Sequence, residues 1–100
     1  MADLCLTLLC PPAQQERLLD ALLMMPEVAI FTSSAAAAHG LRHDHLNASE
    51  QVLGLAVMTQ VQVLLAEAQH GAVLAALREE FAGSGVRFWL TPIIQAGEFE

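Results

Sequence analysis

The stretch Leu4-Cys-Leu-Thr-Leu-Leu-Cys-Pro-Pro12 decides how the fold is laid out. Its apolar run predicts a buried strand over 3–9, which the two prolines bring to an end. Proline in the first turn of a helix removes no intrahelical hydrogen bond, so the pair favours a helix directly afterwards. Apolar residues at 18, 19, 22, 23 and 25 have helical spacing and predict that helix over 13–25, ended by Pro26.

Strand and helix patterns then recur along the rest of the chain. The segment EVAIFTS (27–33) predicts a second strand because it is rich in β-branched and aromatic residues. Alternating Val and Gln side chains predict a third strand over 51–65 with one buried face. Apolar residues at 73, 74, 77 and 81 predict a helix over 67–81, and 86–94 reads as the last strand.

This order of elements is the split βαβ pattern. It predicts a single α+β domain over 1–100 with a ferredoxin-like βαββαβ fold, in which a four-stranded antiparallel sheet carries two helices on one face. Hydrophobic residues make up 55% of the chain and charged residues 15%, against about 25% in a typical domain. We therefore expect self-association over the uncovered face of the sheet. Phe88 and Trp89 are adjacent, so one of them should face away from the helices and contribute to that interface.

Charge and apolar run length exclude several classes of protein. The net charge is −7, there is no lysine and the four arginines are scattered, so nucleic-acid binding is not expected. The chain lacks the run of about 18 apolar residues that a membrane span requires, and it is not expected to be membrane-embedded. Residues 1–10 lack a basic start and a small-residue cleavage site, which favours the cytoplasm over secretion.

The segment 34–50 departs from both periodicities and contains His39, His43 and His45. Imidazole is a common ligand for divalent transition metals, so these residues are candidate ligands for zinc, copper, nickel or cobalt. A helical segment would put His39 and His43 on one face, whereas an extended one would pair His43 with His45. A flexible loop could also gather all three around an ion. A solvated polar loop and a pH-dependent structural role are the alternatives. The alanines at 35–38 could extend the preceding strand or form a helical turn.

Catalytic motifs do not stand out in the sequence, and enzyme activity is not expected. Cys10 precedes a helix N-terminus, which can lower the pKa of a thiol, although a packed apolar role suits it better. Cys5 is expected in the core. His70 is expected at the surface or as a capping residue. Met24 and Met25 end a helical stripe and are expected to fill the core.

Several short motifs, taken in order, resemble one bacterial family. They are Leu6-Thr-Leu-Leu-Cys-Pro-Pro12, Phe31-Thr-Ser33, His39-Gly40, His45, Glu50-Gln-Val52, Gly54 and Phe88-Trp89 with Pro92. The chain resembles small PII-like proteins of the nitrogen-regulatory PII superfamily, which are often encoded beside heavy-metal RND efflux pumps. The resemblance implies a PII-like fold, a homotrimer, a long T-loop-like segment (34–50), and a regulatory or sensor role in metal resistance with an efflux pump as partner.

The sequence also bears on nucleotide binding and on alternative functions. PII proteins hold nucleotide phosphates with lysines and arginines, and here only Arg42 lies in the long segment, so a nucleotide is not expected. The alternative function is a dimeric ferredoxin-like α+β barrel enzyme, for which His70 or Cys5 would be the catalytic candidates. An adaptor subunit without a ligand is the third reading.

Overall fold

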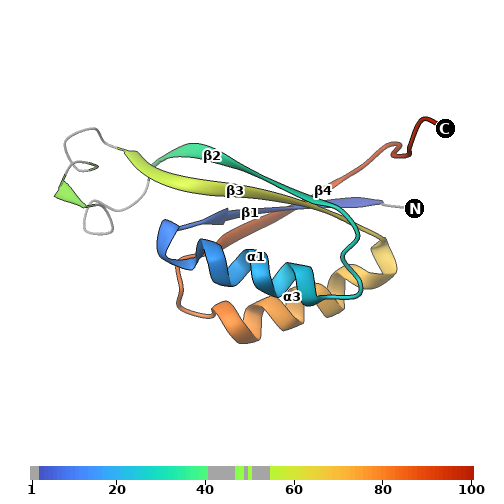
Figure 1. Ribbon diagram of the computed structural model, residues 1–100, viewed down its shortest axis with the longest axis horizontal. Helices are drawn as coiled ribbons and strands as arrows, with labels where there is room; N and C mark the ends of the chain where they lie inside the picture. Colours follow the sequence, from blue (N-terminus) through green and yellow to red (C-terminus); the bar gives the residue numbers. More distant parts are fainter. Residues whose placement is uncertain (1–2, 41–46, 49, 51–54) are drawn as a thin grey trace.

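The computed structural model describes residues 3–40, 47–48, 50 and 55–100. In chain order, its elements are β1 (Leu4–Cys10), the 3-10 turn η1 (Pro12–Gln14), α1 (Gln15–Met24), β2 (Phe31–His39), β3 (Leu55–Leu65), α3 (Glu67–Phe81) and β4 (Arg87–Pro92). The strands form one antiparallel sheet in the order β2-β3-β1-β4. Both helices lie on the same side of that sheet (Figure 1). The expected α+β, ferredoxin-like fold is confirmed.

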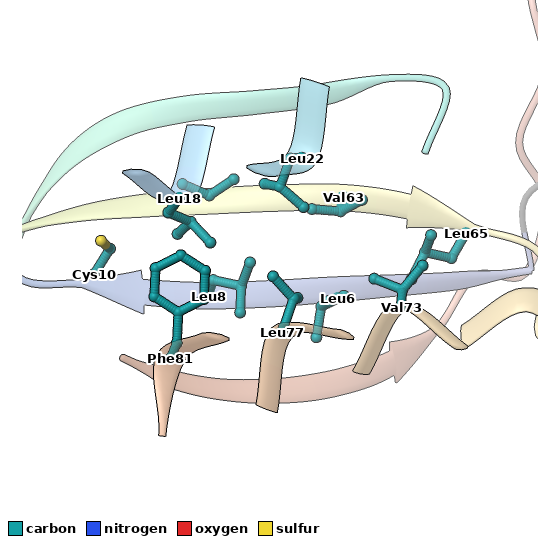
Figure 2. Packing of buried hydrophobic residues seen from close by; sticks show 11 residues of the cluster. Leu6, Leu8, Cys10, Leu18, Leu22, Val63, Leu65, Val73, Leu77 and Phe81 are labelled. Carbon is teal, nitrogen blue, oxygen red and sulfur yellow. The ribbon is translucent and has the colours of Figure 1, made fainter. Parts of the chain in front are cut away.

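The main core lies between the sheet and the two helices (Figure 2). Alternate residues of each strand point to the same face, so Leu6 and Leu8 of β1 join Val61 and Val63 of β3 beneath the helices. The helices contribute Leu18, Leu22, Val73, Leu77 and Phe81. These are positions that the helical spacing selected. Leu23, which the spacing also selected, and Met24, which was expected to fill the core, are instead 70% and 83% exposed.

Among the described residues, no helix lies on the opposite face of the sheet, and we call it the helix-free face. The register places Cys5, Thr7 and Leu9 of β1 on it, since their neighbours Leu6 and Leu8 face the helices. A second cluster of Ala38, Ala56 and Met58, with Leu9 packed against it, lies there. Trp89 pairs with Thr7 and is 45% exposed on this face. Phe88 instead lines a hollow with Leu77 and Phe81, so the expected division between the two aromatic residues is confirmed.

The second strand differs from the prediction at both ends. It was expected over 27–33 and is observed at Phe31–His39, because Pro26 and Glu27 form a turn first. Its nine residues pair with β3 from Phe31–Val63 to His39–Leu55. The alanines at 35–38 therefore extend the strand and do not form a helical turn, which was the other alternative. Residues 34–39 of the expected loop (34–50) are thus strand, and the described part of that loop begins at Gly40.

The remaining elements agree more closely with the sequence. The second helix has the predicted bounds, and the last strand is shorter than predicted by one residue at its start and two at its end. The third strand is described from Leu55, and its expected start at 51–54 lies outside the described residues. Within the described ranges, neither helix is long and apolar enough to span a bilayer.

Candidate functional site

The candidate metal ligands are only partly placed by the structure. His39 is the last residue of β2, where it pairs with Leu55 and is exposed. His43 and His45 lie outside the described residues. Within the part of the chain that the structure describes, no three His, Cys, Asp or Glu side chains are close enough together to hold a metal ion. The metal site therefore remains a prediction.

Glu50 links the segment before β3 to the sheet. The backbone N–H of Asn47 donates to Glu50 Oε1 at 3.1 Å, and the N–H of Glu50 donates to Asn47 Oδ1 at 2.9 Å. This reciprocal pair is a capping box, which satisfies two backbone donors at the start of a helical turn. The second carboxylate oxygen, Oε2, accepts the Val57 N–H at 2.8 Å. One side chain thus holds both the capped turn and the first residues of β3.

The Val57 contact has a simple origin in the sheet. Pairing between β1 and β3 ends at Cys10 and Thr59, so Val57 lies two residues beyond the end of that ladder. A backbone amide without a strand partner needs another acceptor, and the carboxylate supplies one. The backbone hydrogen bonds from Val57 and Asn47 hold the pKa of Glu50 below its ordinary value of 4.5, because they stabilise the charged form.

This linkage should depend on pH. Because the pKa of Glu50 is lowered in the folded state, its charged hydrogen bonds stabilise the fold fully above pH 4.5, the ordinary glutamate value. This stabilisation is lost as Glu50 becomes protonated at lower pH. We expect the Val57 amide proton resonance to move with this titration. Amide chemical shifts recorded from pH 7 to pH 3 would show it. In a Glu50→Gln variant the Val57 shift should stay flat, and an identical titration in that variant would contradict the assignment.

Glu50 also lines a cleft of about 410 Å³, which we call the loop-base cleft. The cleft lies where three distant segments meet, and its described lining residues are Pro11, Pro12, Glu50, Ala56, Val57, Met58, Gly83, Ser84, Gly85 and Arg87. Gly83 and Gly85 have φ of +76° and +87°, a backbone region that favours glycine. A Cβ on Gly85 would lie 3.4 Å from Pro11 Cγ, so this turn closely approaches the junction of β1 and η1.

The charges of the loop-base cleft are of opposite sign. Glu50 supplies a carboxylate and Arg87 a guanidinium, and the other described lining residues are apolar or small apart from the Ser84 hydroxyl. Glu50 was not among the residues predicted from the sequence to form a site. The signal for Glu50 was the spacing Asn47-x-x-Glu50, which is typical of a capping box.

The cysteines and His70 do not form a common site, and each has its own surroundings in the fold. Cys10 is buried, its Sγ donates to the Pro11 carbonyl at 3.3 Å, and burial raises the pKa of its thiol above 9.0. The low-pKa interpretation is therefore wrong, and the packed interpretation holds. Cys5 is only partly buried, because it lies on the helix-free face rather than in the main core. His70 contacts the Glu67 carbonyl through Nδ1 in the first turn of α3, and the N-cap residue makes no side-chain hydrogen bond that caps the start of this helix.

These positions bear on the alternative enzyme function. His70 belongs to a helix on the covered side of the sheet, and Cys5 lies on the helix-free face. The sheet therefore separates the two catalytic candidates, which do not share a pocket.

Comparison with known proteins assigns the chain to a family. A family model described as "Protein of unknown function (DUF3240)" matches residues 1–100. The chain belongs to the DUF3240 family. Among curated proteins, none is significantly similar in sequence.

Two solved structures are similar to this one. The crystal structure of a DUF3240 family protein from Shewanella baltica has a TM-score of 0.81 and 18% identity, covering 100% of this chain and 99% of that one. A protein described as a candidate PII-like signaling protein from Thermus thermophilus has a TM-score of 0.65 and 14% identity, covering 93% and 88%. At these identities the likeness shows the fold, which is PII-like.

Proposed function

We propose that the chain is a PII-like regulatory subunit that assembles as a homotrimer through its helix-free face. The observation that carries the proposal is a group of apolar residues on this face, Leu9, Met58 and the half-exposed Trp89. They lie among polar neighbours such as Thr7 and Gln62, on a side of the sheet that no helix of the described residues covers. The PII-like fold of the Thermus thermophilus neighbour supports a signalling role. Covering this face with other subunits also accounts for the high hydrophobic share of so small a domain.

The mass of the protein in solution tests this assembly. We expect light scattering to give three times the 10.7 kDa subunit mass. A value of twice that mass would favour the dimeric barrel alternative, and a monomer would contradict both. The assay requires no ligand, so its outcome is independent of the metal proposal below.

We further propose that the segment between β2 and β3 is the responsive part of the subunit. His39, His43 and His45 would bind a divalent transition metal such as zinc, copper, nickel or cobalt, and occupancy would change how the segment engages an efflux-pump partner in the cytoplasm. Support comes from the exposed position of His39 and from the net charge of −7, which attracts cations. Glu50 gives the segment a defined attachment to β3. A nucleotide is not proposed, since one cation and one carboxylate line the described part of the loop-base cleft.

Removing the three histidines should abolish metal binding. Isothermal titration of each of the four metals against the wild type should release or absorb heat, and the His39/His43/His45→Ala triple variant should give only the heat of dilution. His70→Ala is the matched control, because it removes the fourth histidine, which packs against the Glu67 carbonyl. Equal heats in the wild type and the triple variant would contradict the metal site.

A further inference from the structure

A groove lies between the outward surfaces of α1 and α3, on the opposite side of the molecule from the helix-free face. It has a volume of about 410 Å³, and its lining residues are Arg17, Asp20, Ala21, Met24, Met25, Ala76 and Glu80. We call it the interhelix groove. Figure 1 shows the two helices side by side beneath the sheet.

The apolar part of this surface is not used by the subunit's own core. Met24 is 83% exposed, although it belongs to a helix whose other face is fully packed. Ala21 and Ala76 supply short side chains to the groove, so a partner can approach the helices closely. Methionine is flexible and polarisable, which suits it to contact with apolar partners of variable shape.

The charged part of the surface is acidic. Asp20 lies one turn before Met24 on α1, and Glu80 lines the groove from α3. Arg17, which also lines the groove, makes its hydrogen bonds within the subunit. It donates to the Glu80 backbone carbonyl at 2.8 Å and to Gln14 Oε1 at 3.0 Å, and its guanidinium lies 4.9 Å from the centre of the Phe81 ring. These partners are neutral, so Arg17 keeps its charge, and the two carboxylates of Asp20 and Glu80 outnumber it in the lining of the groove.

We propose that the interhelix groove binds a basic amphipathic helix of a partner protein. The apolar stripe of such a helix would pack on Met24 and Ala21. Its lysines or arginines would face Asp20 and Glu80. Charge complementarity selects this partner, since a second copy of the chain would bring a net charge of −7 to an acidic surface. The groove stays open when the helix-free face is covered, so this surface adds a second contact to the proposed assembly.

Methionine methyl resonances allow a direct test. The probe is a synthetic helical peptide of about 18 residues, or about five turns, built from leucine and lysine only. In protein labelled at the methionine methyl carbons, the peptide should shift the signals of Met24 and Met25. The signal of Met58, which is buried on the helix-free face, should stay in place. A shift at Met58 without one at Met24 would overturn the proposal.

A matched pair of charge variants separates a built groove from general attraction to an acidic protein. Asp20→Lys/Glu80→Lys should weaken peptide binding at least about tenfold, by fluorescence anisotropy. Glu98→Lys/Glu100→Lys makes the same change in net charge in the exposed tail and should weaken it less than about twofold. Equal losses in both pairs would overturn the proposal. The proposal would also be overturned if the wild type bound no peptide and Met24→Glu lowered the oligomer mass. The groove would then be a contact between copies of the chain.

Discussion

Replacing Leu22 with alanine is expected to lower the free energy of unfolding by about 2–5 kcal/mol. Leu22 is completely buried between α1 and the sheet, in contact with the core cluster that holds the two helices in place. The substitution removes apolar contacts and leaves a cavity that a well-packed core cannot fully close. Urea denaturation followed by circular dichroism would measure the change.

The neighbouring Leu23 provides a matched control. It has the same side chain on the same helix but is 70% exposed, so Leu23→Ala should change the free energy of unfolding by less than about 0.5 kcal/mol. Both variants need the same subunit concentration as the wild type, since assembly stabilises the folded chain by mass action. Similar losses in the two variants would contradict the packing described for α1.

Replacing Trp89 with aspartate is expected to convert the proposed assembly into monomers. Trp89 lies opposite Thr7 in the register and presents its ring on the helix-free face, so an aspartate there would place a charge in the proposed interface without a partner. Light scattering should show the mass falling to the 10.7 kDa of one subunit.

Leu23→Asp is the control for this experiment. It introduces the same charge at an exposed apolar position on the helix side of the molecule. Its mass should remain that of the wild type. If Trp89→Asp also keeps the wild-type mass, the helix-free face is not the subunit interface.

The sequence predicted the helices and the fold class well, because side-chain period and breaker residues decide them locally. The bounds of α3 agree with the spacing of Val73, Leu77 and Phe81 and with the glycines that follow. β2 was harder to predict, since four alanines have little strand propensity of their own. These alanines form a strand because they pair with β3, and this pairing cannot be predicted from the local sequence.

The candidate site was less accessible from the sequence. The loop-base cleft joins Pro11, Glu50 and Arg87, which are far apart in the chain and meet only once the sheet is formed. The exposure of Met24 was also missed. Met24 follows the buried Leu22 by two residues, so it points to a different side of α1 and lines the interhelix groove. The histidine cluster, by contrast, was visible as a pattern and is placed by the structure only at His39.

The two cysteines give the protein a built-in chemical reporter of its state. Cys10 is buried in the main core with a raised thiol pKa, so it should resist alkylation until the chain unfolds. Cys5 is partly accessible on the face that assembly would cover. A maleimide should therefore label Cys5 rapidly in separated subunits and slowly in the assembled protein, and label Cys10 only on denaturation. Mass spectrometry of one labelling time course would then follow dissociation and unfolding as separate events, without any introduced probe.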